Sequence, residues 1–423
     1  MEARVQNNQS FTLKISLQKL VAYVYFFFNS VGLKGGLLYT NLLTPFLLIW
    51  IHKKGFIKKL VIPLLIIMPF SVIHYIMGVD LKTFIISHVL FFSSIVFVLA
   101  AYIYLANYKS LKPVMKSILV FNFVLVLIAI PFYFMDKPFQ QLFWYTNKFT
   151  DQSKISRLSL FTFEASYYSL LLVPIVYYYL LKIGFYKSIQ KKIQILALTL
   201  IPLILSMSFG IIGGTLIVFL LMIWFNRYLL VTNRKVFFIL SSLLAITVLS
   251  LITLFLFFSD NILVARIGNI FTGTDTSYSG RTSESFQVAW EIASKKSIWF
   301  GSGLGQPKLL LPDIIEQHIR NNTLWHWKTG DTYRIPNTLA ETLAIFGIIG
   351  LVVRLVIIFY LFVKTKVNTN YFRLSLFLFI FIYQFTGSYI TNVVEYVIWV
   401  FAFTNVFPEF DVNGSTSKQK TLT

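Results

Sequence analysis

Long apolar runs separated by short basic turns fill most of the chain, and one long polar stretch interrupts them. A hydrocarbon core about 30 Å thick is crossed by roughly 20 apolar residues in a helix. Runs of this kind predict twelve spans, at roughly 15–31, 37–51, 60–78, 83–106, 114–135, 161–181, 193–207, 211–226, 236–258, 338–363, 374–387 and 390–407. We therefore predict an all-α polytopic membrane protein with about 12 transmembrane helices.

Two pairs of these spans are divided by turns. The stretch 193–225 is too long for one ordinary span, and the segment from Ser206 to Gly210 offers a turn in its middle. The stretch 374–407 breaks in the same way near Gly387 and Ser388. Both breaks keep the later basic clusters on the same side of the membrane as the earlier ones.

The polar interruption, Ser259 to Asn337, is the segment best suited to chemistry. It contains seven of the sixteen acidic residues and four of the eight tryptophans. The chain is predicted to have four regions. Residues 1–258 contain spans one to nine and a short loop at 136–160, and residues 259–337 form this partly helical loop. Residues 338–407 contain spans ten to twelve, and residues 408–423 form a tail.

The distribution of charge decides the orientation of these regions. The chain has a formal charge of +21, and 57% of its residues are hydrophobic. Lys and Arg gather in alternate turns, for example Lys53 to Lys59 and Lys187 to Lys192, as the positive-inside rule predicts for cytoplasmic turns. Both termini are then cytoplasmic, and the two polar loops face outward, away from cytosolic nucleotides. Because the surplus charge follows topology, it does not indicate nucleic-acid binding.

An arginine and an amphipathic helix form the first candidate site in the large loop. Arg281 comes directly before a predicted helix at about 282–296. Four residues of that helix share its apolar face, namely Phe286, Ala289, Trp290 and Ala293. A guanidinium at a helix N-terminus creates an anion site whose fork geometry suits phosphate. The alternative is that Arg281 pairs with Glu284 and holds the loop together.

A glycine run follows this helix. Gly301, Gly303 and Gly305 would let backbone N–H groups approach a phosphate or a sugar. No predicted strand precedes the run, so the dinucleotide-binding fingerprint does not apply. Taken by itself, the run is better explained as a turn that returns the loop to the membrane.

The start of the tenth span carries an amide and a carboxylate on one face. Asn337 and Glu341 are four residues apart, and Pro336 suits the first turn of a helix. A carboxylate at the outer end of a span suits general acid–base work, and the alternative is a glutamate that complements the helix dipole. Arg354, near the middle of this span, either binds substrate in a deep cavity or pairs with Glu395.

Three further charged or titratable side chains lie in the outward segments. Arg157 and Glu164 near the mouth of the sixth span form either part of a site or a surface ion pair. His326 lies between two tryptophans, which either stack on sugars beside a titrating imidazole or anchor the loop at the interface. The chain has no cysteine, and no histidine or carboxylate cluster has ligand spacing, so a metal site is not supported.

Together these motifs resemble the O-antigen polymerase/ligase superfamily of bacterial inner membranes. The shared blocks are an arginine, a tryptophan and a glycine run in a late periplasmic loop, then an asparagine, a glutamate and a pair of glycines. In this chain they are Arg281, Trp290, Gly301 to Gly305, Asn337, Glu341, Gly347 and Gly350. The segments Arg157 to Tyr167 and Ser206 to Gly210 add to the likeness.

The resemblance implies a membrane glycosyltransferase of GT-C-like architecture that needs neither metal nor cofactor. Its donor would be a glycan on undecaprenyl pyrophosphate and its acceptor a repeat unit on the same carrier, surrounded by membrane lipid. It also allows a chain-length regulator as a partner. Arginines would stabilise the leaving pyrophosphate, here Arg281, Arg157, Arg334, Arg266 and Arg354. Further substrate contacts would come from Trp290, Asn337, Gly301, Gly303 and Gly305, and the base stays open among Glu341, Glu164 and His326.

Two departures from the family pattern favour a Wzy-type polymerase over a ligase. Ligase-like members often have His-Asn where this chain has Pro336 and Asn337, and relatives often have arginine where Phe209 lies. An O-antigen ligase, which transfers the glycan to lipid A–core, is the first alternative. A lipid-linked oligosaccharide flippase is the second, although the two halves of the chain show no similarity.

Overall fold

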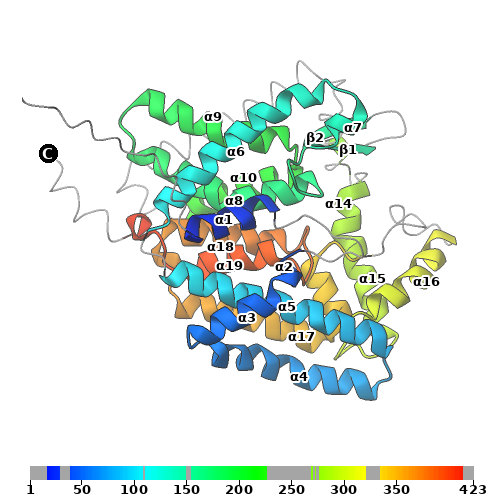
Figure 1. The fold of residues 1–423 in the computed structure, drawn as a ribbon. Coiled ribbons are helices and arrows are strands. Elements are labelled where there is room, and N and C mark those ends of the chain that lie inside the picture. The colour runs from blue at the N-terminus through cyan, green and yellow to red at the C-terminus, as the bar shows by residue number, and fades with distance from the viewer. Residues whose placement is uncertain are drawn as a thin grey trace, which may run out of the picture.

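The computed structural model describes residues 17–28, 39–107, 110–148, 154–225, 268–269, 272, 276–320 and 334–412, and this part of the chain is mostly helical (Figure 1). The first helices are α1 (Leu17–Phe28), α2 (Tyr39–Leu42), α3 (Thr44–Lys53), α4 (Val61–Ile76), α5 (Leu81–Asn107), α6 (Lys112–Tyr133) and α7 (Lys137–Gln140). The middle helices are α8 (Ala165–Lys182), α9 (Ile189–Leu205), α10 (Phe209–Phe225), α14 (Thr276–Arg281), α15 (Ser283–Ser294) and α16 (Pro307–Arg320). The last are α17 (Thr338–Lys364), α18 (Tyr371–Tyr383) and α19 (Val393–Phe403). Single 3₁₀ turns lie at Ile57–Leu60, Ile183–Phe185, Val367–Thr369 and Pro408–Phe410.

Helices occupy the predicted spans. Every span predicted from an apolar run coincides with one or two helices, except 236–258, which lies outside the described residues. The two predicted breaks are also confirmed. Met207 has φ 45° between α9 and α10, and residues 384–392 leave the helical path between α18 and α19.

Several of these helices can cross a membrane. Among the described residues, five are long and apolar enough, at Ile57–Ile76, Leu81–Asn107, Lys112–Tyr133, Ala165–Phe185 and Thr338–Lys364. The chain is thus a helical multi-pass membrane protein, and the count of twelve spans stays a prediction.

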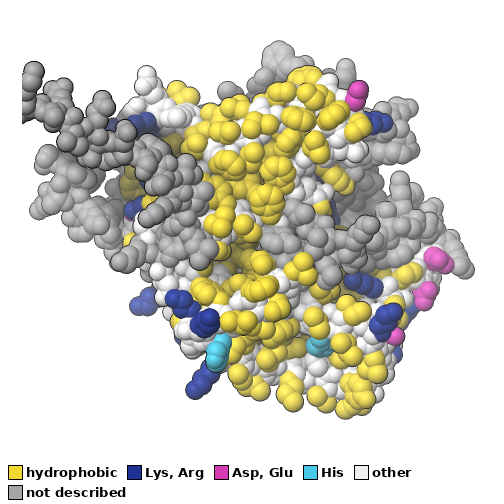
Figure 2. Space-filling model, in the orientation of Figure 1, with side chains coloured by type: hydrophobic (Ala, Val, Ile, Leu, Met, Phe, Trp, Pro, Cys, Tyr) yellow, Lys and Arg dark blue, Asp and Glu magenta, His cyan; other side chains and the backbone are white. Residues whose placement is uncertain are grey.

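Burial distinguishes peripheral helices from central ones. In the most apolar window of the α4 span 17% of the residues are buried, against 78% for the α8 span, so α8 lies in the centre and α4 at the edge. Hydrophobic side chains dominate the face drawn in Figure 2, as a lipid-facing surface requires. Around α8, the ring of Tyr177 stacks on Phe219 and meets Phe379 edge-on, which joins α8 to α10 and α18.

The expectation of an all-α protein is wrong in the loop 136–160. There β1 (Trp144–Lys148) and β2 (Lys154–Leu158) form an antiparallel hairpin. Trp144 and Leu158 face each other and are buried, and the Trp144 indole donates a hydrogen bond to the carbonyl of Ala129 at 2.7 Å. Most of the other strand residues are polar, so the strands lack the alternating apolar pattern that predicts a half-buried strand.

The predicted tenth span is confirmed as α17, but the helix is broken at Gly347, which has φ 68° and ψ −167°. A break of this kind frees backbone groups, which must find other partners inside a membrane protein. The segment 298–303, which contains the start of the glycine run, supplies them. The bonds are Ser302 N to Ala344 O (2.9 Å), Gly303 N to Ile345 O (3.0 Å), Ile348 N to Ile298 O (3.0 Å) and Ile349 N to Trp299 O (3.1 Å).

Two glycines make this close approach possible. A Cβ atom on Gly347 would lie 2.4 Å from the carbonyl of Trp299, and one on Gly301 would lie 2.4 Å from the carbonyl of Ile345. Both glycines have positive φ, so any larger residue would also be strained there. The glycine run therefore inserts into the broken helix and attaches the polar loop to the membrane helices.

Helices α15 and α16 of the polar loop pack beside the first turns of α17. The predicted amphipathic helix is confirmed as α15, and the predicted Ala289 and Ala293 are buried. The buried face also includes Val288 and Ile292, which with Ala289 pack against residues of α16 and α17. Trp290, expected on the apolar face, is 52% exposed. The packed face is therefore centred about one position away from the predicted one, with Val288 and Ile292 inside it and Trp290 outside it.

Candidate active site

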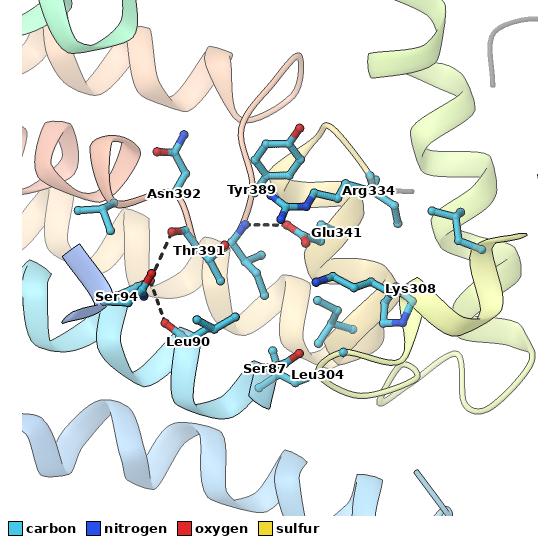
Figure 3. A pocket seen from close by; sticks show the side chains of 18 of the residues that line it. Ser87, Leu90, Ser94, Leu304, Lys308, Arg334, Glu341, Tyr389, Thr391 and Asn392 are labelled. Atoms are coloured by element: carbon cyan, nitrogen blue, oxygen red, sulfur yellow. Dashed lines mark hydrogen bonds between the residues drawn. The ribbon is translucent and has the colours of Figure 1, made fainter. Parts of the chain in front are cut away.

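A cavity of about 160 Å³ lies where the first turns of α17 meet α5, the start of α16 and the 384–392 linker (Figure 3). Its charged and titratable lining residues are Glu341, Lys308, Arg334, Tyr167 and Tyr389. Its uncharged polar lining includes Asn41, Ser87, Ser94, Thr391 and Asn392. The remaining wall is mainly apolar, with Leu90, Leu304, Leu311, Ile345, Ile390 and Val393. This combination of a mostly apolar wall and a few convergent polar groups is typical of a ligand site.

Glu341 is the carboxylate of the cavity. It lies one turn inside α17, whose N-cap is Asn337. Its Oε2 accepts a hydrogen bond from the backbone amide of Ile390 at 2.6 Å, which turns the carboxylate toward the linker. The other carboxylate oxygen has no hydrogen-bond partner among the described residues. One oxygen of the Glu341 carboxylate is thus held in place, and the other oxygen is available to a ligand.

Two cations share the cavity with this carboxylate. Lys308 extends from the first turn of α16 toward Glu341 in Figure 3, and the Arg334 guanidinium lies 5.5 Å from the centre of the Tyr389 ring. Burial lowers the pKa of Lys308, nearby Arg334 lowers it further, and Glu341 raises it. In the described part of the chain no ion pair joins either cation to a carboxylate. The cavity therefore carries a net positive charge and suits an anion.

Tyr389 marks the point where the charged groups converge. Burial raises the pKa of its phenol, Glu164 and Glu341 raise it too, and Arg281 and Arg334 oppose them. The phenol is therefore protonated at neutral pH and can donate a hydrogen bond. All four charged side chains lie close enough to act on this one hydroxyl.

Arg281 and Glu164 meet beside the cavity. Arg281 ends α14, Glu164 precedes α8, and the Nη2 atom of the arginine lies 3.9 Å from Oε1 of the glutamate. Both side chains keep part of their surface exposed, 37% and 28%. The residues Phe163 and Tyr167, on either side of Glu164, line the cavity itself. The fold thus brings together residues of two segments that are remote in the sequence.

Asn337 positions the protein's own backbone. It is fully buried, and its Oδ1 accepts the amide of Ala340 at 2.9 Å as the N-cap of α17. Its Nδ2 donates to the carbonyls of Arg281 at 2.8 Å and Phe385 at 2.6 Å. These bonds occupy the amide and tie Arg281 and the linker to the start of α17.

Of the three glycines in the run, Gly305 is the one that lines the cavity. The amide of Gly301 donates to Ser297 at 2.6 Å, and that of Gly303 is bound to the broken helix, so neither amide is available to a phosphate. Gly305 lines the cavity, and a Cβ atom there would lie 2.6 Å from Oγ of Ser87. This placement supports the turn interpretation for Gly301 and Gly303.

Arg354 forms the predicted pair with Glu395. Its Nη2 atom lies 2.6 Å from Oε1 of Glu395, and its Nε donates to Oε1 of Gln384 at 3.3 Å. The Glu395 side chain is 0% exposed. Arg354 does not line the cavity and instead links α17 to α18 and α19.

The other candidates lie away from the cavity or outside the described residues. Arg157 is buried in β2, with its guanidinium 5.7 Å from the centre of the Tyr145 ring. Trp290 is exposed on α15. His326 and Arg266 lie outside the described residues. Among the described residues, no group of three His, Cys, Asp or Glu side chains is placed to hold a metal ion.

Two residues of the cavity, Lys308 and Tyr389, are not marked by any motif in the sequence around them as site residues. Lys308 follows the glycine run by three residues, and Tyr389 follows the break at Gly387 and Ser388. The break itself was the available signal, because an unwound linker between two apolar helices exposes backbone and side chains to a cavity. Nothing in the local sequence separates Lys308 from the other basic residues of the loop.

One comparison with known proteins bears on this site. A family model described as O-Antigen ligase matches residues 194–355, a segment that includes the glycine run, Lys308 and Glu341. No curated protein matches the chain. The match supports a likeness of this chain to the superfamily of O-antigen polymerases and ligases. Enzymes of that superfamily act on lipid-linked glycans in the synthesis of surface polysaccharides. The match does not distinguish polymerase activity from ligase activity.

Proposed function

We propose that this protein is a glycosyltransferase that polymerises undecaprenyl-pyrophosphate-linked repeat units of O-antigen or a related surface polysaccharide. The observation that carries the proposal is a half-satisfied carboxylate, Glu341, in one cavity with two cations, Lys308 and Arg334. The carboxylate provides a proton acceptor. The cations provide a place for negative charge to develop.

In the proposed reaction Glu341 takes the proton of the acceptor hydroxyl while the hydroxyl oxygen bonds to the anomeric carbon of the donor. The bond between that carbon and the pyrophosphate oxygen breaks, and its electron pair leaves with the pyrophosphate. Lys308 and Arg334 stabilise this leaving charge, with Arg281 beside them. The products are a longer glycan on the acceptor's carrier and free undecaprenyl pyrophosphate. Because the leaving group is already activated, the transfer needs no further cofactor.

The proposal includes an orientation. The polar loop and the cavity face the periplasm, both termini face the cytoplasm, and the polyprenyl tails lie along apolar helix surfaces such as α4. The cluster of Lys53 to Lys59 after α3 supports a cytoplasmic turn there. Labelling of a cysteine introduced at exposed Asp313 of α16 by a membrane-impermeant reagent in intact spheroplasts tests this orientation.

An O-antigen ligase is the second candidate, because the family model that matches the chain is described by that activity. Both activities use the same donor and differ in the acceptor. In cells that lack this protein, single repeat units on the lipid A–core would indicate lost polymerisation. Unsubstituted core would indicate lost ligation.

The direct test uses the purified protein in nanodiscs with the lipid-linked repeat unit as the only substrate. A ladder of longer lipid-linked glycans is the expected result. Transfer to added lipid A–core without such a ladder would support the ligase instead. Failure to transfer the glycan to either acceptor would overturn the glycosyltransferase proposal.

A further inference from the structure

The cavity has an uncharged end as well as a charged one. In Figure 3 Glu341, Lys308 and Arg334 gather on one side, while Ser94, Thr391 and Asn392 lie on the other and Ser87 lies between them along α5. Ser87, Leu90 and Ser94 share one face of α5 because they are spaced by three and four residues. The charged end is accounted for by the proposed function, and the uncharged end is not.

Two hydroxyl groups at this end are available to a ligand. The side chains of Ser87 and Thr391 line the cavity and are partly exposed, and neither hydroxyl has a hydrogen-bond partner among the described residues. The hydroxyl of Ser94, by contrast, faces the carbonyls of Leu90 at 3.1 Å and Thr391 at 3.3 Å. Ser94 therefore holds the linker against α5 and places Thr391 at the cavity.

Both available hydroxyls lie on segments that also reach the charged end of the cavity. Thr391 directly follows Ile390, whose amide binds the Glu341 carboxylate at 2.6 Å. Ser87 contacts Gly305, which precedes Lys308 by three residues on the same cavity wall. A ligand that extends from one end of the cavity to the other can therefore contact these hydroxyls and the charged groups together.

We infer that Ser87 and Thr391 form a subsite for the sugar ring that is attached directly to the donor's pyrophosphate, an inference that rests on the proposed function. A ring in this place has its anomeric carbon between the phosphate-binding cations and Glu341. Its hydroxyls satisfy Ser87 and Thr391, and its C–H face packs on Leu90 and Ile345. A polyprenyl tail would leave both hydroxyls unsatisfied, and a second phosphate would find no cation at this end.

The test compares two probes, undecaprenyl pyrophosphate and the lipid-linked repeat unit, binding to the full-length protein in nanodiscs. For Ser87→Ala and for Thr391→Val we expect the affinity for the repeat unit to fall about two- to tenfold, the cost of one hydrogen bond. The affinity for undecaprenyl pyrophosphate should stay unchanged. Thr391→Ser keeps the hydroxyl and should bind both probes like the wild type.

Ser375→Ala is the matched control, because its buried hydroxyl on α18 bonds only the Phe372 carbonyl within its own helix. Equal weakening of both probes would show that the hydroxyls only shape the cavity and would overturn the sugar subsite. Unchanged binding of the repeat unit would overturn it as well. If the wild-type protein bound neither probe, the proposed function itself would fail, and the inference with it.

Discussion

Two carboxylates in the α17–α19 region, Glu395 and Glu341, differ in how completely they are satisfied. Glu395 is fully buried and accepts from Arg354 at 2.6 Å, from Thr338 at 2.8 Å and from Trp399 at 3.4 Å. Glu341 accepts only the Ile390 amide among the described residues and faces a cavity with two cations. A carboxylate with hydrogen-bond partners on both oxygens, such as Glu395, holds helices together. A carboxylate with one oxygen unbonded and cations nearby, such as Glu341, can accept a proton from a substrate.

Among the described residues the Glu164 carboxylate has no hydrogen bond and is the least satisfied of the three. Its single ion pair, with Arg281 at 3.9 Å, is loose and partly exposed, and it lies at the edge of the cavity. Glu395 is therefore the structural carboxylate, and the two less satisfied glutamates, Glu341 and Glu164, lie in or beside the cavity. Four predictions test this contrast between a structural carboxylate and carboxylates that border the cavity.

Removal of the charge of Glu341 should stop turnover. We expect Glu341→Gln to lower the rate of glycan extension by about 10²- to 10⁴-fold, the usual contribution of a general base. Stability should change little, because the glutamine carbonyl can still accept the Ile390 amide. The rate in nanodiscs and the thermal midpoint measure the two effects.

The control for Glu341→Gln is Asp313→Asn, which removes an exposed carboxylate from α16 and should leave the rate intact. A Glu341→Gln protein with wild-type turnover would mean that the base lies elsewhere, and Glu164→Gln would then be the next variant to assay.

Loss of the partner of Glu395 should instead damage the fold. Arg354→Met leaves a buried carboxylate uncompensated, and we expect a loss of about 3–5 kcal/mol of unfolding free energy. Thermal or denaturant unfolding in detergent measures this loss. Adding Glu395→Gln should restore part of it, because no unpaired buried charge then remains and the amide still accepts from Thr338.

The opposite outcome for Arg354 is also informative. A stable Arg354→Met protein with weakened donor binding would favour the alternative in which the arginine reaches substrate in a deep cavity. The contrast between Glu395 and Glu341 would then no longer separate structure from chemistry.

Arg281→Ala should leave the protein folded but abolish long glycan chains, with extension slowed on the order of 10²-fold, as for the loss of one charge-stabilising donor. The backbone carbonyl that binds Asn337 is unchanged by this substitution, so the local fold should persist. Gel ladders from a complemented deletion strain show the effect. Lys295→Ala, at the exposed C-terminal end of α15, is the matched control, and normal ladders from Arg281→Ala would remove this arginine from the site.

The smallest effect concerns pH. Because burial lowers the pKa of Lys308, its ammonium loses a proton at a lower pH than an ordinary lysine. Affinity for undecaprenyl pyrophosphate should therefore decline on the alkaline side. Lys308→Arg stays protonated and should remove that decline, with little change at neutral pH. Identical alkaline profiles for the two proteins would show that Lys308 does not contact the pyrophosphate.

The candidate site was only partly visible in the sequence. Glu341 and Arg281 were identified because a carboxylate at the start of a span and an arginine before a helix are unusual in an acid-poor apolar chain. Lys308 and Tyr389 were missed because their significance depends on neighbours far away in the sequence. Gly301 and Gly303 suggested a phosphate site, yet their amides bond to the broken helix, a contact that no local pattern announces.

The sequence by itself determined the helices, their apolar surfaces and the two breaks, because a backbone in hydrocarbon must satisfy its hydrogen bonds within each helix. Only the tertiary structure decided which glutamate is saturated and which faces a cavity. That choice depends on which distant groups, such as Arg354 or the Ile390 amide, come within hydrogen-bond distance of each carboxylate once the helices pack.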